Sequence, residues 1–249
     1  MTSPAATEGR ETSRGTLYLI PVGLGGGNAQ DTLPAATLAA VRGLHAFIAE
    51  NPKSARRFLQ AAGYPRALRE VQIATLDEHT AMSELTELVA PLLSGQDCRL
   101  LSEAGCPAVA DPGAELVRLA HARGVRVVPL VGPCAILLAL MASGLNGQRF
   151  EFHGYLPIDS GRRAHRLKEL EDDAARTGAT QIFIETPYRN DVMLRSVLAH
   201  CRRDTLLCIA ADLTLPTESI VTASIADWKK RAPALGRRPA VFLLWRSPN

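Results

Sequence analysis

Two turns rich in Gly and Pro constrain the fold of this chain more than any other feature. The first turn, at 102–113, follows the apolar run 99–102, and the second, at 131–134, follows the apolar run 125–130. A helical pattern follows each turn. In an open α/β sheet, the turns at the carboxyl ends of the strands form the ligand crevice, where small residues let the backbone approach a ligand closely. The two turns therefore predict one ligand site built from two loops.

Short apolar runs alternate with amphipathic segments of helical length through the first part of the chain. A helix that opens at Thr32, capped by Asp31 or Thr32, is expected after the first strand. Alternation of this kind predicts a parallel sheet with crossover helices. The expected strands are 17–22, 46–50, 71–76, 99–102 and 125–130, and the expected helices are 32–42, 52–62, 80–94, 113–124 and 133–143.

The pattern changes near residue 147, after which strands outnumber helices. This change predicts a second α/β domain with a mixed sheet, so that the chain divides into a disordered tail at 1–14 and domains at 15–147 and 148–249. The expected strands are 150–155, 181–185, 206–211, 218–224 and 240–245, with helices at 162–176 and from the turn at 186–188 to residue 201.

Bulk composition excludes several classes of protein. No apolar run approaches the roughly 18 residues that a membrane helix needs, and the polar residues 1–14 lack the apolar core of a secretory signal. The chain has five cysteines and no C-x-x-C pair, which argues against a disulfide framework and a zinc site and favours the reducing cytoplasm.

Charge is distributed unevenly along the chain. Residues 1–148 carry 12 Lys and Arg against 13 Asp and Glu, whereas residues 149–249 carry 16 against 12. Basic residues cluster at 162–168, 202–203, 229–231 and 237–238. These clusters are typical either of solvated helix faces or of a surface that contacts a phosphate-bearing partner. With 5% aromatic residues, the chain shows no evident stacking platform for single-stranded RNA.

The motifs, taken in order, resemble those of one family. The chain resembles the tetrapyrrole methylase superfamily of S-adenosylmethionine (SAM)-dependent methyltransferases over residues 16–246, most closely the branch that contains ribosomal RNA small subunit methyltransferase I. The motifs that carry the resemblance are the Gly-rich loop 23–27, Ser102-Glu-Ala-Gly-Cys-Pro107, Asp111-Pro-Gly113, Gly132-Pro-Cys-Ala135, Phe152-His-Gly-Tyr-Leu-Pro157 and Glu185-Thr-Pro-Tyr-Arg189.

The resemblance implies a homodimer of two-domain subunits, with SAM in a cleft between the domains. It also implies a ribosomal RNA substrate, methylated on the ribose 2′-oxygen of a small-subunit cytidine, and neither a membrane nor a metal. The cofactor-binding residues that it implies are Gly23, Leu24, Gly25, Ser102, Glu103, Ala104, Cys106, Cys134, Ala135, Glu185, Leu213, Thr214, Pro239 and Ala240.

The chain departs from the pattern of that branch at four places. The first loop, at 21–28, is longer and richer in Gly. Glu50-Asn-Pro-Lys53 replaces Glu-Asp-Thr-Arg, Ser102-Glu-Ala-Gly-Cys-Pro107 replaces Ser-Asp-Ala-Gly-Thr-Pro, and Val131-Gly-Pro133 replaces Pro-Gly-Pro. The cofactor loops keep their outline while the run at 50–53 is altered. The resemblance therefore supports SAM binding more strongly than it supports the RNA target.

Methyl transfer depends mainly on positioning, but a hydroxyl acceptor gains from a base. Glu50, Glu103 and Asp111 all follow predicted strands and are the candidate catalytic residues, although each can instead serve as a turn or cap residue. Glu185 has the same two interpretations. Histidine and cysteine spacing suggests no metal site, and Cys106 and Cys134 lack an adjacent histidine, so they are expected to line the pocket.

Three other functions fit parts of the sequence. A tetrapyrrole C-methyltransferase, acting on a precorrin or uroporphyrinogen-like substrate, uses the same fold. A non-catalytic SAM-binding or RNA-binding protein is compatible with the altered run at 50–53. A nicotinamide dehydrogenase is suggested by the Gly-rich loop at 23–27, but Asn28 occupies the position of the third glycine of that fingerprint.

Overall fold

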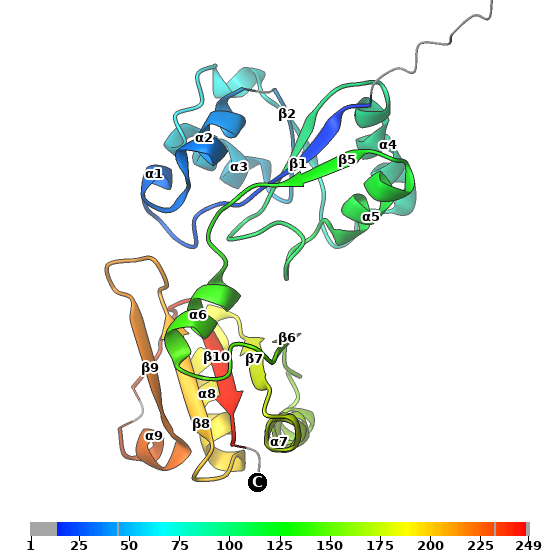
Figure 1. The fold of residues 1–249 in the computed structure, drawn as a ribbon. Coiled ribbons are helices and arrows are strands. Elements are labelled where there is room, and N and C mark those ends of the chain that lie inside the picture. The colour runs from blue at the N-terminus through cyan, green and yellow to red at the C-terminus, as the bar shows by residue number, and fades with distance from the viewer. Residues whose placement is uncertain (1–13, 44, 232, 248–249) are drawn as a thin grey trace, which may run out of the picture. The chain divides into compact units, whose positions relative to one another are not determined.

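The computed structural model describes residues 14–43, 45–231 and 233–247, which form two compact units (Figure 1). Within the described residues, unit 1 consists of 14–23 and 28–132, and unit 2 consists of 24–27 and 133–247. The tail expected at 1–14 lies outside the described residues except for Arg14.

Unit 1 is built on a five-stranded sheet with the order β3-β2-β4-β1-β5, in which every pair is parallel. β1 lies between β4 and β5, so that Leu17 is opposite both Cys98 and Val127. The expected parallel sheet is confirmed. Its strands are β1 (Thr16–Ile20), β2 (Ala46–Ala49), β3 (Gln72–Thr75), β4 (Cys98–Leu101) and β5 (Arg126–Pro129).

Helices cover both faces of this sheet because its connections run in two directions. From β1 to β3 the chain moves toward one edge, and from β3 to β5 it moves back, so right-handed crossovers place the helices on opposite faces. Phe47 packs with Leu38 and Leu59 on one face, and its neighbour Ile48 packs with Val89 on the other. The helical segments are α1 (Ala29–Thr32), α2 (Ala35–Arg42), α3 (Pro52–Ala61), η1 (Leu68–Glu70), α4 (Met82–Leu93) and α5 (Ala114–Ala122).

The first helical segment begins earlier than the sequence predicts. Asn28, not Asp31 or Thr32, is the N-cap, since its Oδ1 accepts a hydrogen bond from the N–H of Gln30 at 3.2 Å. The short helix α1 ends at Thr32, and α2 starts afresh at Ala35, after Pro34. The prediction of one helix from Thr32 was therefore wrong, because the proline separates two helices.

Unit 2 is built on a mixed sheet with the order β6-β7-β10-β8-β9. The pattern of strands and helices in the second half of the sequence predicts this mixed sheet. Only the β6–β7 pair is parallel, and the other three pairs are antiparallel. The elements are α6 (Ala135–Ser143), β6 (Phe150–Tyr155), α7 (Ser160–Thr177), β7 (Thr180–Ile184), η2 (Pro187–Arg189), α8 (Asn190–His200), β8 (Leu206–Ala211), β9 (Ser219–Ser224), α9 (Ile225–Arg231) and β10 (Ala240–Trp245).

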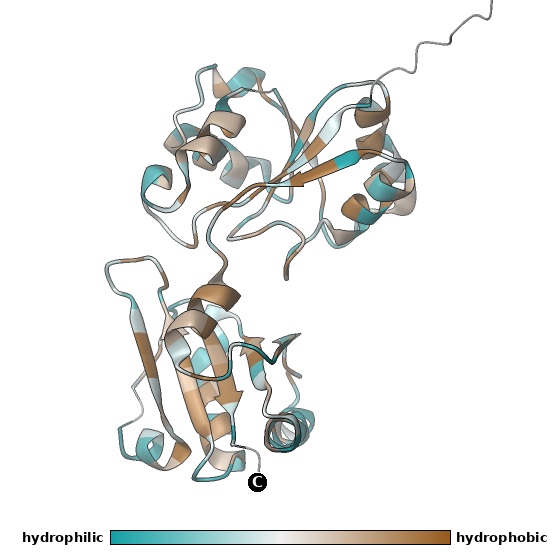
Figure 2. Ribbon diagram, in the orientation of Figure 1, coloured by the Kyte–Doolittle hydropathy of each residue, from teal (hydrophilic) through white to brown (hydrophobic). Residues whose placement is uncertain are grey.

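The central strands of unit 2 are apolar on both faces because helices cover both. Phe242 stacks on Phe183 at 5.5 Å beneath α7 and α8, whereas Val241 and Leu243 pack against α6. Figure 2 shows the contrast between the hydrophobic helix α6 and the largely hydrophilic helix α7. Continuous burial of β10 explains why its sequence reads as an uninterrupted apolar run.

The boundary between the units falls between residues 132 and 133, whereas the change in the sequence pattern predicted a boundary near residue 147. The difference is helix α6, whose Ile136, Ala139 and Leu140 belong to the unit 2 core.

Helix α9 is not expected from the sequence pattern. Ile225 and Trp228 bury one side of it, while its other side contributes to the basic run at 229–231. In the described part of the chain, no helix is both long and apolar enough to cross a membrane.

Replacement of Gly113 by Ala tests the tight turn before α5. Gly113 has a φ of 126°, and a Cβ there would lie 2.5 Å from Cδ2 of the buried Leu100. We expect Gly113→Ala to lower the free energy of unfolding by about 1–3 kcal/mol, measured by urea denaturation. Gly147→Ala is the matched control, since a Cβ at Gly147 meets no atom within 4 Å. We expect the control to change stability by less than about 1 kcal/mol, and equal effects of the two substitutions would contradict this account.

Candidate functional site

The carboxyl ends of the strands lie along one edge of the unit 1 sheet, which we call the carboxyl edge. This edge has the geometry of a ligand crevice. β1 and β4 are neighbours, but the chain leaves β1 toward the face covered by α2 and leaves β4 toward the face covered by α5. Loops that diverge in this way open a crevice at the switch point of an α/β sheet. The two loops are held together by a pair of backbone hydrogen bonds, Val22 N–H to Gly105 O at 2.9 Å and Gly105 N–H to Val22 O at 3.2 Å.

The loop after β4 is conformationally strained. Ala108 and Ala110 have positive φ angles of 63° and 54°, and glycines with positive φ flank them at 105 and 113. Among the described residues other than glycine, positive φ occurs only at these two alanines and at Asp212 and Thr214. Left-handed alanine costs about 1–2 kcal/mol, and such strain concentrates where a ligand is bound. Both strained segments coincide with loops that the resemblance assigns to the cofactor.

The structure brings the three candidate catalytic carboxylates together at this edge. Burial raises the pKa of Asp111 to about 6, and the negative charges of Glu50 and Glu103 add to the rise, while hydrogen bonds from Ser102 and from the Glu103 N–H partly offset it. Partial burial also raises the pKa of Glu50, as do the charges of Glu103 and Glu78. These carboxyl groups are therefore close enough to influence one another's ionisation.

The loop after β3 contributes two further carboxylates, Asp77 and Glu78, that sequence reasoning did not assign to the site. Asp77 closes its own turn, because its Oδ1 accepts hydrogen bonds from the N–H of His79 at 2.9 Å and from the hydroxyl of Thr80 at 3.1 Å. Those bonds lower the pKa of Asp77. His79 is exposed and lies 3.5 Å from Glu78. The available signal was that Asp77 and Glu78 follow a predicted strand, so a parallel sheet carries them to the same edge.

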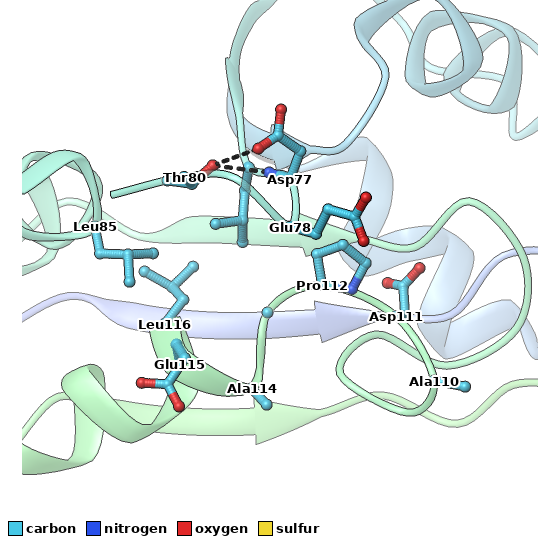
Figure 3. Close-up of a pocket in the computed structure, with 12 residues that line it drawn as sticks. Asp77, Glu78, Thr80, Leu85, Ala110, Asp111, Pro112, Ala114, Glu115 and Leu116 are labelled. Atoms are coloured by element: carbon cyan, nitrogen blue, oxygen red, sulfur yellow. Dashed lines mark hydrogen bonds between the residues drawn. The ribbon is translucent and has the colours of Figure 1, made fainter. Parts of the chain in front are cut away.

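A cavity of about 410 Å³ lies beside these carboxylates (Figure 3). The loop after β3 and the segment from Ala110 to Leu116 line it. Leu85 and Leu116 lie at one end, whereas Glu78 and Asp111 lie toward the other (Figure 3). Glu115 also lines the cavity, beside Leu116 (Figure 3), so carboxylates border both ends, and all the lining residues belong to unit 1.

Three segments of unit 2 meet at one end of its mixed sheet. β7 ends at Ile184, just before Glu185, β8 ends next to Asp212, and β10 begins at Ala240, which is paired with Ala211. Glu185 is buried and ion-paired, with Oε2 2.9 Å from the Arg189 guanidinium, while its Oε1 accepts a hydrogen bond from the Thr186 N–H at 2.8 Å. The carboxylate of Glu185 thus holds the turn before α8, but it does not cap a helix, since neither η2 nor α8 has a side-chain hydrogen bond at its N-cap.

An ion pair holds the strained turn after β8. The Arg238 guanidinium lies 2.6 Å from Oδ2 of Asp212 and donates a second bond to the Thr217 carbonyl at 2.5 Å. Burial would raise the pKa of Asp212, but hydrogen bonds from Arg238 and Thr217 outweigh it and lower that pKa. The Thr214 N–H is bonded to Glu218 at 2.8 Å. Asp212 and Thr214 therefore keep their left-handed conformations through side-chain contacts on both sides of Leu213.

The Gly-rich loop after β1 is divided between the two units. Gly23 ends a segment of unit 1, whereas Leu24 packs into the unit 2 cluster that contains Leu213 and Ala135. A Cβ at Gly25 would lie 2.9 Å from Cδ1 of Leu215, so this glycine allows the loop to lie against the turn after β8. The residues implied as cofactor contacts thus form a unit 1 group of Gly23, Ser102, Glu103, Ala104 and Cys106, and a unit 2 group of Leu24, Gly25, Cys134, Ala135, Glu185, Leu213, Thr214, Pro239 and Ala240.

The altered run at 50–53 preserves the local structure of a helix start. Asn51 is the N-cap of α3, since its Oδ1 accepts hydrogen bonds from the N–H groups of Lys53 at 2.9 Å and Ser54 at 3.4 Å. Pro52 occupies the first turn, where the missing N–H has no cost. Asparagine replaces aspartate as the cap and lysine replaces arginine as the cation, so the departure retains both physical features.

The sequence of the chain matches a known protein family over most of its length. The family model of Tetrapyrrole (Corrin/Porphyrin) Methylases matches residues 16–228. The chain belongs to this family. The expected methyltransferase is confirmed at the level of the family.

Three curated relatives illustrate the likeness, each with the name Ribosomal RNA small subunit methyltransferase I. The Pseudomonas aeruginosa protein is 33% identical over 95% of this chain and 82% of its own length, and the Escherichia coli O157:H7 protein is 33% identical over 87% and 72%. The Vibrio cholerae protein is 38% identical over 61% of this chain and 51% of its own length. The solved structure of the methyltransferase CobJ has a TM-score of 0.62 at 20% identity and covers 93% of this chain and 94% of CobJ, which confirms the predicted α/β fold.

Within the described residues, no group of three His, Cys, Asp or Glu side chains is placed to hold a metal ion. None of the five cysteines, all of which lie in the described part of the chain, forms a disulfide.

Replacement of Arg238 by Gln tests whether the ion pair positions the turn at 212–214. We expect Arg238→Gln to weaken SAM binding at least tenfold in isothermal titration calorimetry, because Asp212 and Thr214 lose the contacts that hold their backbone. Arg237→Gln removes the same charge next to it, where the described part of the chain offers no ion pair. The control should bind SAM within twofold of the wild type. Equal SAM affinity in both variants would refute the positioning role.

Proposed function

We propose that the chain is a SAM-dependent methyltransferase that methylates the ribose 2′-oxygen of a cytidine in small-subunit ribosomal RNA. One observation carries the choice of substrate. Relatives with the name Ribosomal RNA small subunit methyltransferase I align with 85–95% of this chain at 32–33% identity. CobJ shares the fold at 20% identity.

The residues present suit SAM, which combines a sulfonium cation, an ammonium and a carboxylate with an adenosine. Carboxylates at the edge of the unit 1 sheet complement positive charge. The apolar cluster of unit 2 that includes Leu24, Ala135 and Leu213 suits an adenine ring. The residues that the resemblance implies as cofactor contacts would hold SAM, which supplies an electrophilic methyl group when bound.

Asp111 is the residue best suited to accept the proton of the ribose hydroxyl. A carboxylate with a pKa of about 6 is a stronger base than an ordinary aspartate and is still ionised at neutral pH. Glu50 and Glu103 are more exposed to solvent than Asp111. We therefore assign Asp111 as the general base, with burial as the main cause of its raised pKa and the charge of Glu50 as a smaller one.

Homodimerisation and a cytoplasmic location belong to the same proposal. The family resemblance supports the homodimer, and the five cysteines without a C-x-x-C pair support the reducing cytoplasm.

The substrate can be tested by mass spectrometry of small-subunit ribosomal RNA from a strain that lacks this protein. We expect the loss of one ribose methyl group on a cytidine, because the proposed enzyme is absent, and its return when the gene is restored. An unchanged methylation pattern would exclude the RNA substrate. Incorporation of labelled methyl groups from SAM into a uroporphyrinogen-like acceptor would then favour C-methylation, and no incorporation into any acceptor would favour a binding protein.

Asp111→Asn should stabilise the protein at neutral pH even though it removes the proposed base. A carboxyl group whose pKa is higher in the folded chain than in the unfolded chain makes the folded state less stable as the pH rises from about 4 to about 6. We expect Asp111→Asn to raise the Tm at pH 7.5 by about 2 °C, since solvent screens the partly exposed carboxyl. The gain should be much smaller at pH 4, where Asp111 is protonated in the folded state and about half protonated in the unfolded state. Scanning calorimetry at the two pH values checks this, and a lower Tm at pH 7.5 would contradict it.

A further inference from the structure

Residues 51–69 form the most uniformly basic stretch of the chain. They include Lys53, Arg56, Arg57, Arg66 and Arg69, without a single Asp or Glu. Five of the 12 Lys and Arg in the first 148 residues therefore fall within 19 positions. The near-neutral total charge of the first half conceals this local concentration.

Three of these cations share one face of helix α3. Lys53, Arg56 and Arg57 are spaced i, i+3 and i+4, which places them on the same side of a helix. Ala55 and Leu59 are buried on the opposite side. Lys53 and Arg57 are exposed, and Arg56 contacts only the Pro52 carbonyl among described hydrogen-bond partners, at 3.4 Å. We call Lys53, Arg56 and Arg57 the α3 basic face.

The basic clusters of the second half are neutralised to a larger extent. Of the 16 Lys and Arg after residue 148, eight lie in ion pairs: Arg162, Arg166, Arg176, Arg189, Arg202, Lys230, Arg238 and Arg246. Arg163 is buried and donates hydrogen bonds to the carbonyl of Ile158 and the hydroxyl of Ser196. None of the cations in the α3 basic face has an ion-pair partner in the described part of the chain.

The α3 basic face also lies at the edge of the sheet that carries the carboxylates. α3 begins two residues after Glu50, at the carboxyl end of β2, and β2 is paired with β4. Phosphate groups would be attracted to the α3 basic face and repelled by Glu50, Glu103 and Asp111. The N–H groups of Lys53 and Ser54 are already bonded to Asn51, so the attraction comes from the side chains rather than from the helix end.

We propose that the α3 basic face binds the phosphodiester backbone of the RNA substrate and so directs a ribose toward Asp111. This inference rests on the proposed function, and it assigns the docking surface to unit 1 rather than to the basic clusters of the second half. Recognition of this kind depends on phosphate charge and is sensitive to salt.

A charge-removal experiment with a matched control tests the docking surface. One variant carries Lys53→Gln, Arg56→Gln and Arg57→Gln, which remove three charges and preserve helix propensity. The control carries Arg203→Gln, Lys229→Gln and Arg231→Gln, three exposed cations of unit 2 without ion pairs among the described residues. The probe is small ribosomal subunits from a strain that lacks the protein, with affinity measured at several salt concentrations together with the Kd for SAM, the KM for subunits and kcat.

We expect the α3 variant to bind subunits at least tenfold more weakly, with the salt slope of log Kd reduced by about 2–3 because three phosphate contacts are lost. Its KM should rise by a similar factor, while kcat and the Kd for SAM stay within twofold. The control should change subunit affinity by less than threefold. A charge-conserving variant, Lys53→Arg with Arg56→Lys and Arg57→Lys, should restore binding, which separates lost charge from a damaged helix.

Three results would overturn the docking surface: unchanged subunit affinity in the α3 variant, an equal loss in the control, or no recovery in the charge-conserving variant. Failure of the proposed function looks different. In that case the wild-type protein itself would transfer no methyl group to small subunits, whatever the variants bind.

Discussion

The parallel pairing of β1 with β4 determines where this protein can place a ligand. β1 and β4 are adjacent in the sheet but distant in sequence, and the chain leaves them toward opposite faces. The loops that follow must diverge, and the Val22–Gly105 bridge fixes how close they stay at their base. Because the sheet is parallel, every loop after a strand reaches the same edge. The carboxylates that follow β2, β3 and β4 therefore meet there without any local sequence signal that links them.

Electrostatics gives that edge its chemical character, at a cost in stability. Several carboxyl groups lie close together around Asp111, which has less contact with water than an ordinary surface aspartate, and its pKa rises to about 6. Left-handed alanines at 108 and 110 add backbone strain in the same loop. A fold optimised for stability alone would relieve both features. Both features occur in a loop that the resemblance assigns to the cofactor. This coincidence is typical of a functional site, where strain and unfavourable charge are retained for function.

Much of this architecture could be predicted from the sequence. Apolar runs located the strands of both sheets, and the Gly and Pro turns located the loops that carry Asp111 and Cys134. Long-range placement was harder to predict. The pairing of Arg238 with Asp212 joins two loops separated by 26 positions, and the burial of Arg163 depends on contacts with α8, so the basic clusters of the second half looked freer than they are. Asp77 and Glu78 joined the candidate site only through the strand order, and helix α9 was concealed within a charged run.

We propose that Asp111, whose pKa is raised mainly by burial and further by the charges of neighbouring carboxylates, acts as the base. The most direct test is the pH dependence of single-turnover methyl transfer to small ribosomal subunits, for the wild type and Asp111→Asn, with the exposed Glu87→Gln as the control. We expect the wild-type rate to rise with pH through an apparent pKa near 6 and then to level off, because the base must be ionised. Asp111→Asn should lack this inflection, and its rate should be lower by a factor of about 10²–10⁴. The control should match the wild type. A rate for Asp111→Asn within threefold of the wild type, with the inflection intact, would contradict it.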